Sequence, residues 1–246
     1  ALHHASDFHA LPRVSPKSQT GHLLVGPRYS ILSDAHRNAA RAGALPRTRL
    51  LLSMGGADPH RLTPRLAPLV RQAIEEALNR GGITGCDVVL GPAFVDPEGE
   101  EAARLRAAGW RVHSAIAAET MAQLMRRARL ALIGFGTSLT ELAYHRTPFL
   151  TVTHHDHDRA PARDLETEGI GRVLGTARDL DPDRVRRRIR AALEDDAWLQ
   201  ESAAHAFERI DGGAGSRRIF EALENEAPRS SPGLPARSKA PPPLSP

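Results

Sequence analysis

Apolar and polar positions alternate between two periods along the chain, and this alternation predicts the fold. Short apolar runs typical of buried parallel strands are followed by segments whose apolar residues recur at helical spacing. The predicted strands are 22–26, 48–54, 86–91, 110–113, 129–134, 148–153 and 172–174. The predicted helices are a short one within 33–46, then 61–80, 97–108, 119–128, 138–145, 159–168, 183–194, 197–210 and 216–223. The sequence therefore predicts an α/β fold, a Rossmann-like parallel sheet with helices on both faces.

The same pattern divides the chain into three regions. Residues 1–46 start with an irregular stretch rich in His and Pro and continue into a linker, and we interpret them as the remnant of something upstream. Residues 47–224 hold the regular alternation and form the predicted α/β domain. Residues 225–246 are rich in Pro and Ser, cannot bury apolar area, and are predicted to be a disordered tail.

Charge and composition narrow the class of protein. The net charge is +4, but 33 basic and 29 acidic residues are interspersed and aromatic residues make up only 4%, which disfavours a nucleic-acid-binding surface. Cys86 is the single cysteine, so no intrachain disulfide is possible, and its apolar surroundings favour a core position. No apolar run is long enough to span a membrane, and the first ten residues lack a signal-peptide pattern. A cytoplasmic enzyme fits these features.

Ligands of open parallel sheets bind beyond the carboxyl ends of the strands, so the loops that follow the strands are candidate sites. The first such loop contains Gly55 and Gly56 directly after the strand 48–54. Glycines there let the backbone approach a ligand closely, and the following helix offers free amides to an anion. A simple tight turn is the alternative interpretation.

The second loop is the turn Gly134-Phe135-Gly136-Thr137-Ser138, which leads from a strand into a helix. Its amides and two hydroxyls suit a diphosphate, and Glu141, one turn into the helix, is placed to accept hydrogen bonds from ribose hydroxyls. The alternative is a capping box, with Ser138 as N-cap and Glu141 three residues later. A Walker loop is excluded because no Gly-Lys-Ser/Thr follows.

The third loop, His154-His155-Asp156-His157-Asp158, follows the strand 148–153. Histidine and carboxylate side chains are ligands for zinc or manganese. Adjacent residues on one short loop rarely converge on a single ion, however, so a polar loop that faces a ligand is the favoured interpretation and no metal site is predicted.

In this order the motifs resemble a known family. LLVGPRYSIL, RLLLSMGGADP, DVVLGPAF, ALIGFGTSLTELAYHRTPFL and GIGRVLG, which together span 22–175, are similar to the C-terminal region of the UDP-sugar hydrolases of pseudaminic acid biosynthesis. That family belongs to the wider GT-B group, which includes the undecaprenyl-pyrophosphoryl-muramoyl-pentapeptide GlcNAc transferase. The resemblance implies the C-terminal domain of a GT-B fold, with residues 1–46 ending its N-terminal domain, and a UDP-sugar substrate.

The resemblance also implies roles for the three loops. Gly55, Gly56 and Asp58 would lie near diphosphate and sugar, and Glu141 would hold the ribose. The remaining implied UDP-sugar contacts are Ile116 and Met121 beside the uracil, Gly136, Thr137, Ser138 and Leu139 on the diphosphate, and Asp156, His157 and Asp158 on the sugar. Water would attack the anomeric carbon and UDP would leave, with no metal or cofactor required because the helix at 138 stabilises the diphosphate charge.

Two departures from the family limit these implications. The family usually has Asp-Asn-Gln where this chain has Asp156-His157-Asp158, which indicates a different donor sugar. The family's catalytic His lies in a Gly-rich loop of the N-terminal domain, and none of the early histidines His3, His4, His9 and His22 lies in such a loop, so no catalytic base is assigned. A GT-B glycosyltransferase donor domain and a non-catalytic nucleotide-sugar-binding module remain alternatives, and a separate N-terminal domain or chain is the expected partner.

Overall fold

A computed structural model describes residues 24–79 and 81–226 and contains one parallel sheet in the strand order β3-β2-β1-β4-β5-β6. The strands are β1 (Arg49–Ser53), β2 (Gly85–Leu90), β3 (Trp110–Ser114), β4 (Ala128–Gly134), β5 (Phe149–Thr153) and β6 (Arg172–Thr176). This is the strand order of the doubly wound Rossmann fold. The chain adds strands in one direction from β1 to β3 and in the other direction from β4 to β6. At this switch point, between β1 and β4, the loops after the two strands diverge and leave room for a ligand.

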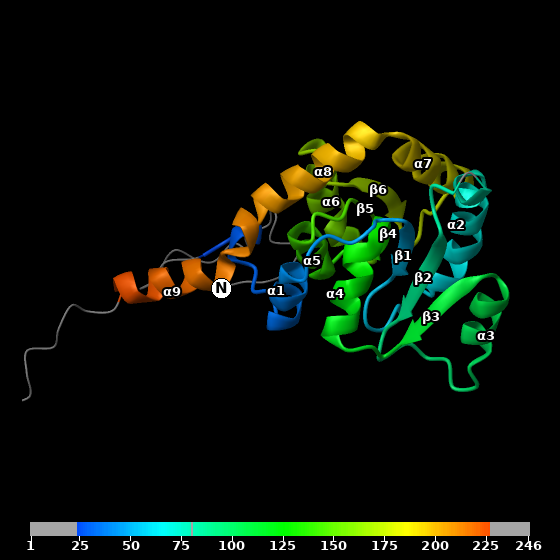
Figure 1. Cartoon of the computed structure of the whole chain (residues 1–246), viewed down its shortest axis with the longest axis horizontal. Helices are drawn as coiled ribbons and strands as arrows, with labels where there is room; N and C mark the ends of the chain where they lie inside the picture. The colour runs from blue at the N-terminus through cyan, green and yellow to red at the C-terminus, as the bar shows by residue number, and fades with distance from the viewer. Residues whose placement is uncertain (1–23, 80, 227–246) are drawn as a thin grey trace, which may run out of the picture.

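Helices cover both faces of the sheet (Figure 1). Alternate residues of β1 separate two apolar clusters, since Leu50 and Leu52 join one and Leu51 joins the other. The first cluster is closed by α2 (Leu62–Asn79), α3 (Glu100–Ala107) and α7 (Pro182–Glu194), and the second by α4 (Ala118–Arg127), α5 (Ser138–Tyr144) and α6 (Arg159–Thr167). Helix α8 (Asp196–Arg209) crosses from the first cluster to the second. The predicted Rossmann-like parallel sheet with helices on both faces is thus confirmed.

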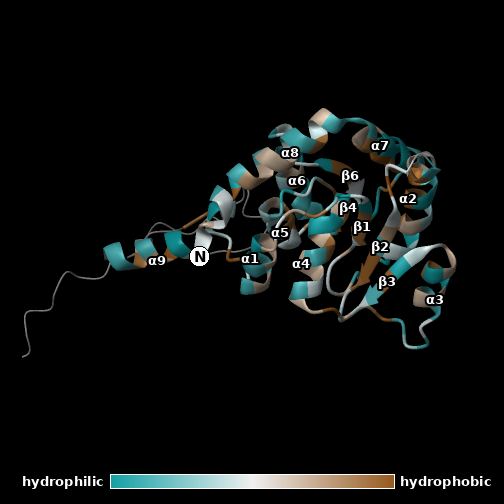
Figure 2. Ribbon diagram, viewed as in Figure 1, coloured by the Kyte–Doolittle hydropathy of each residue, from teal (hydrophilic) through white to brown (hydrophobic). Residues whose placement is uncertain are grey.

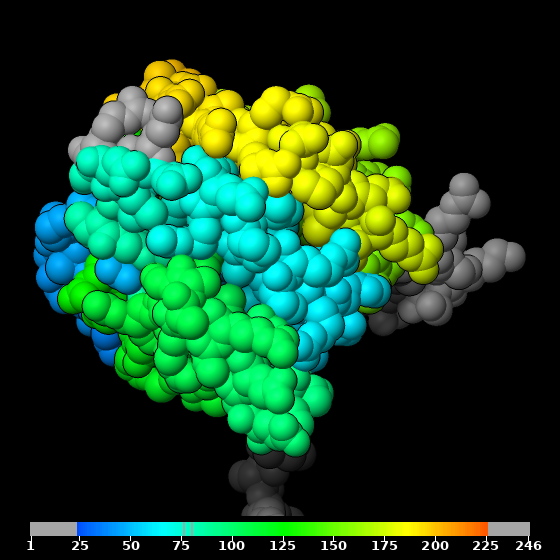
Figure 3. All heavy atoms as spheres, turned by 90° about the vertical axis from the view of Figure 1, so that its right-hand side faces the viewer, coloured from blue at the N-terminus to red at the C-terminus, as the bar shows by residue number. Residues whose placement is uncertain are grey.

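Side-chain polarity follows these layers. In Figure 2 the central strands β1 and β2 are largely brown, the edge strand β3 is largely teal, and teal residues are frequent on the helices. Figure 3 shows α2 and α7 side by side over one face of the sheet, where they pack directly against each other. No helix among the described residues is long and apolar enough to cross a membrane.

The predicted elements agree with the observed ones to within a few residues, with one exception. The described part of the predicted strand 22–26 has no strand neighbour and leads into the 3-10 helix η3 (Pro27–Tyr29), with Gly26 at φ 100°. Helix α3 begins later than predicted because the Asp96 carboxylate accepts hydrogen bonds from the amides of Glu101 and Ala102, at 3.1 and 3.0 Å, and so fixes its start. The predicted tail lies almost wholly outside the described residues.

The segments before and after the domain lie together on one flank. Helix α1 (Asp34–Arg41) packs against α4, and α9 (Gly215–Glu226) packs against η3. A Cβ atom on Gly215 would lie 2.1 Å from the carbonyl oxygen of Ser30, so this close approach requires glycine. Beyond that contact α9 projects from the body of the molecule (Figure 1), and Phe220 and Leu223 on it are each 60% exposed.

Candidate functional site

The loops after β1 and β2 meet at the carboxyl edge of the sheet. The amide of Ala93 donates to the carbonyl of Gly56 at 2.9 Å. A Cβ on Gly91 would lie 2.3 Å from the oxygen of Gly56 and 2.4 Å from that of Gly55. Such distances are too short for any side chain, so glycine at 91 permits the contact that fixes the exposed Gly55-Gly56 turn next to the switch point.

His154 joins the loops after β4, β5 and β1. Its Nε2 atom would be 2.5 Å from a Cβ on Gly134, so glycine at the end of β4 permits the close approach of the imidazole. Its ring is stacked with that of His60, with 6.1 Å between centroids. Burial lowers the pKa of His154, and its Nδ1 is buried without a hydrogen-bond partner among the described residues. The largely neutral imidazole therefore packs between the loops that follow β4, β5 and β1.

The turn between β4 and α5 presents unpaired amides. Phe135 donates to Val152, while the amides of Leu139 and Thr140 donate to the carbonyls of Gly136 and Thr137. The amides of Gly136, Thr137 and Ser138 have no partner within 24–79 and 81–226. These three consecutive donors beside the switch point can receive an anion.

Two expectations for this turn are corrected. The capping box is wrong, because α5 begins at Ser138, its N-cap is Thr137, and no side chain caps it. Leu139 is only 1% exposed and belongs to the second apolar cluster, so with its amide already paired it anchors the turn from the core instead of contacting a ligand.

Glu141 is held by a pair of buried histidines. Its Oε1 lies 3.4 Å from His36 Nε2, and His36 Nδ1 lies 2.9 Å from His145 Nε2. Burial lowers the pKa of His145 to about 3, with the neighbouring His36, Arg126 and Arg47 adding to the effect, so His145 is neutral. The Glu141 side chain itself is 30% exposed. A carboxylate with one side held and the other open is suited to accept hydrogen bonds from ribose hydroxyls.

Asp58 has a structural role that the sequence did not reveal. It is 4% exposed, and its two carboxylate oxygens each accept a hydrogen bond of 2.7 Å, from the amides of Leu62 and Thr63. The carboxylate thereby caps α2. The cap fixes the carboxylate at the carboxyl edge of the sheet, and the implied contact between Asp58 and the ligand stays a prediction.

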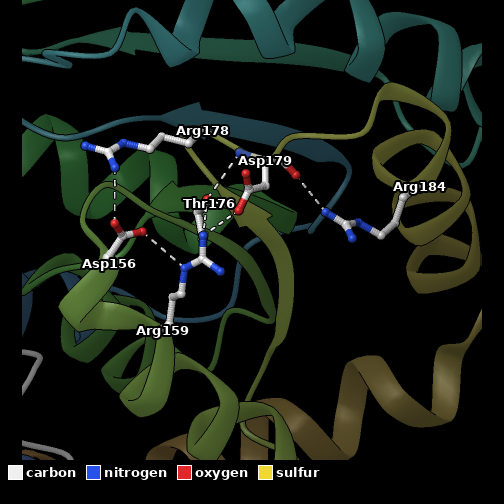
Figure 4. Close-up of polar contacts among 6 residues, drawn as sticks. All are labelled: Asp156, Arg159, Thr176, Arg178, Asp179 and Arg184. Atoms are coloured by element: carbon white, nitrogen blue, oxygen red, sulfur yellow. Dashed lines mark hydrogen bonds and ion pairs between the residues drawn. The ribbon is translucent and has the colours of Figure 1, made fainter.

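The loop after β5 is fixed to the end of β6 by ion pairs (Figure 4). Asp156 lies 3.2 Å from Arg159 and 3.3 Å from Arg178, and Arg159 also pairs with Asp179. Asp158 is buried 3.4 Å from the exposed ring of His157. Of the three residues implied in sugar binding, His157 is therefore the most accessible, and both acids are engaged with neighbouring side chains.

The remaining sequence candidates fall into two groups. Ile116 and Met121 are half-buried at the carboxyl side of β3 and the start of α4, next to the same edge. His113 is half-buried in β3 with its Nε2 atom 2.9 Å from Asp87 Oδ1, so it is engaged within the sheet. The described residues contain no group of three or more His, Cys, Asp or Glu side chains that could hold a metal ion. His3, His4, His9 and His22 lie outside the described residues, and no catalytic base is assigned.

The sequence matches no protein-family model and no curated protein. The fold, however, is similar to solved structures. MurG of Acinetobacter baumannii aligns with a TM-score of 0.55 at 17% identity, over 88% of this chain and 59% of that one. WaaG, a glycosyltransferase involved in lipopolysaccharide biosynthesis, aligns with a TM-score of 0.54 at 17% identity, over 82% and 54%.

A third similar structure is the UDP complex of S. aureus MnaA, with a TM-score of 0.53 at 12% identity over 78% of this chain and 48% of that one. The chain thus spans about half the length of these proteins. At such identities the similarity establishes the fold alone, a Rossmann-like α/β domain of the kind present in these three proteins.

Proposed function

We propose that residues 47–224 bind the UDP part of a UDP-sugar and form the donor domain of a GT-B glycosyltransferase. The observation that carries the proposal is the pairing of three free amides, at Gly136, Thr137 and Ser138, with a carboxylate held nearby at Glu141. Amides at a strand-to-helix turn compensate diphosphate charge, and a carboxylate accepts from vicinal hydroxyls. The similarity to a glycosyltransferase and to a protein solved with UDP supports this assignment.

Hydrolysis of a UDP-sugar is the second candidate. It is favoured by the ordered resemblance of residues 22–175 to the UDP-sugar hydrolases of pseudaminic acid biosynthesis. In that reaction water attacks the anomeric carbon, the bond to the diphosphate oxygen breaks with its electron pair leaving on UDP, and the proton of water passes to a base. That base, and the second wall of the site, would come from the N-terminal domain of the GT-B fold.

Titration of the chain with UDP, AMP and a free sugar tests the shared part of both candidates. UDP should bind most tightly, and chelation by EDTA should leave its affinity unchanged because the turn amides compensate the phosphate charge. Equal, negligible binding of all three compounds contradicts the proposal.

Glu141→Ala tests the proposed ribose contact. We expect the affinity for UDP to fall about 10- to 100-fold, since lost hydrogen bonds to a charged group are worth about 1.5–3 kcal/mol. Binding of 2′,3′-dideoxy-UDP should barely change because it lacks the hydroxyls. Glu201→Ala, which removes an exposed carboxylate from α8, is the matched control.

With a complete N-terminal domain present, release of free sugar without an acceptor would identify hydrolysis, and acceptor-dependent transfer would identify a glycosyltransferase.

A further inference from the structure

A cavity of about 410 Å³ opens at the amino edge of the sheet, opposite the proposed donor site. It lies between the segment 40–47 and the carboxyl ends of α4 and α5. Arg47, Arg126 and Arg146 line it together with Tyr144 and His145, and no Asp or Glu is among the lining residues. The three guanidinium groups come from three segments that are far apart in the sequence.

The positive charge of this cavity has no counter-charge from residues 24–79 and 81–226. Arg126 is 8% exposed and donates to the carbonyl of Gly43 and to Gln123 Oε1, which are neutral acceptors. Arg47 donates to the carbonyls of Ala128 and His145 and to the Thr147 hydroxyl.

Among the described residues no carboxylate pairs with Arg47, Arg126 or Arg146. Burial lowers the pKa of Arg47 and repulsion from Arg126 lowers it further. Buried like charges are costly unless an opposite charge joins them.

The backbone at Arg146 adds a second, independent observation. Thr147 donates to the carbonyl of Leu142 at 2.9 Å and Arg146 donates to that of Ala143 at 3.0 Å. This pattern ends α5 in a Schellman motif, in which the residue at position 146 must be left-handed and is usually glycine. Arg146 adopts φ 51° there, with its guanidinium 3.9 Å above the Phe207 ring. Glycine would adopt this conformation without strain, whereas the arginine at this position adds a third guanidinium to the lining of the cavity.

We propose that this cavity binds a small phosphate-bearing anion through Arg47, Arg126 and Arg146. The dianion of a phosphate group supplies the missing charge, and its tetrahedral oxygens can accept hydrogen bonds from three separately placed guanidinium groups. The cavity leaves room for a small group attached to the phosphate. The site is independent of the proposed UDP-sugar function, because it lies at the other end of α5 and the other edge of the sheet.

Isothermal titration with inorganic phosphate and pyrophosphate, at ionic strength held constant with sodium chloride, tests this proposal. Arg146→Gly should weaken phosphate binding about tenfold or more without lowering the thermal stability, because glycine relieves the left-handed strain. Arg61→Gly is the matched control, since Arg61 also has a positive φ, 50°, and lies 4.9 Å above the Phe94 ring. It should leave phosphate binding within about twofold of the unaltered chain.

Each further outcome decides for or against the site. No binding of phosphate or pyrophosphate overturns the proposal, and so does equal weakening by the two glycine variants, which would indicate unspecific charge. Tighter binding of glycerol 3-phosphate than of phosphate, lost in Arg146→Gly, supports a larger phosphorylated ligand, whereas tighter binding of citrate overturns the choice of phosphate. Glu141→Ala should leave phosphate affinity unchanged, so a failure of the donor-site proposal would not affect this one.

Discussion

The two ends of α5 carry opposite solutions to the binding of an anion. At its start the backbone amides of Gly136, Thr137 and Ser138 are unpaired beside the sheet's switch point. At its end Arg146 and two other arginines surround a cavity without a carboxylate. The first arrangement uses partial charges built into the backbone, and the second concentrates full charges contributed by side chains.

His36 and His145 connect these two ends. His145 lines the arginine cavity and forms a hydrogen bond with His36. His36 in turn contacts Glu141 at the proposed donor site. The comparison teaches that one short helix can serve two separate sites, provided that the group between them stays neutral. His145 meets this condition because its surroundings oppose its protonation.

The largest expected effect is on the free energy of unfolding, and it should distinguish two glycines at the carboxyl edge of the sheet, the crowded Gly91 and the open Gly136. Gly91→Ala should lower the free energy of unfolding by about 1–3 kcal/mol, because the new Cβ meets backbone oxygens that cannot move independently. Gly136→Ala should change it by less than about 0.5 kcal/mol, since nothing lies within 4 Å of its Cβ.

Urea unfolding measures these changes, and titration measures the ligands. Both glycine variants should bind UDP more weakly, because one distorts the turn and the other obstructs it. Phosphate binding at the arginine cavity should stay the same in both. Unchanged stability in Gly91→Ala would mean that the loops after β1 and β2 do not depend on their contact.

The second prediction concerns acid sensitivity at the link between the two ends. The folded pKa of His145, about 3, lies below the unfolded value of about 6.5. Its contribution to stability is therefore complete above about pH 6.5 and is lost as the pH falls toward 3, by at most about 1.4 kcal/mol per pH unit. The free energy of unfolding, measured between about pH 3 and about pH 6.5, should depend less steeply on pH in His145→Asn than in the unaltered chain. The control His155→Asn, which alters an exposed histidine, should keep the full dependence.

Added phosphate provides a further check on this link. Phosphate stays negatively charged over this pH range, so when bound beside His145 it would favour the imidazolium, and the acid slope of the unaltered chain should decrease at saturating phosphate. A slope that is identical in His145→Asn and the unaltered chain would contradict the assigned environment of this histidine.

The sequence predicted the layers well because each element carries its own pattern. The run Leu50–Leu52 has the continuous apolarity of a strand buried on both faces, and the helices show their spacing without reference to distant residues. The turn at Gly136 could also be predicted, since glycines and hydroxyls after a strand are local features. The run at Leu24 resembled a strand, but a strand needs a neighbour, and local pattern does not reveal whether one exists.

Side-chain partners could not be predicted in the same way. His36 and His145 are 109 positions apart, and the three arginines meet only because α1 packs on α4 and α5 ends beside them. The role of Asp58 as the cap of α2 is not visible in the sequence either, because its left-handed φ of 44° is set by the fold. Sites made of backbone groups leave a local motif, whereas sites made of distant side chains depend on packing.

The third prediction tests His36 as a positioning residue for Glu141. His36→Ala should weaken UDP binding about two- to tenfold, the effect of one ordinary hydrogen bond of about 0.5–1.5 kcal/mol. The affinity for 2′,3′-dideoxy-UDP should not change. His36→Gln, whose amide can still donate, should recover part of the loss. The double variant His36→Ala/Glu141→Ala should bind no more weakly than Glu141→Ala alone, because both act on one contact. If the losses of UDP affinity in the two single variants add in the double variant, His36 does not act through the contact between Glu141 and the ribose.

The smallest effect on stability is expected on the flank, away from both ends of α5. Phe220 and Leu223 expose 60% of their surface on the projecting part of α9, and apolar patches of this kind promote association. Replacing both by Ser should lower self-association in sedimentation at increasing concentration, while the free energy of unfolding changes by less than about 0.5 kcal/mol. Val95→Ser, at a residue 72% exposed on the loop before α3, is the control and should leave association unchanged. UDP and phosphate affinities should also be unaffected, because neither end of α5 contacts this patch. If the double variant associates as strongly as the unaltered chain, the surface of α9 is not where copies meet.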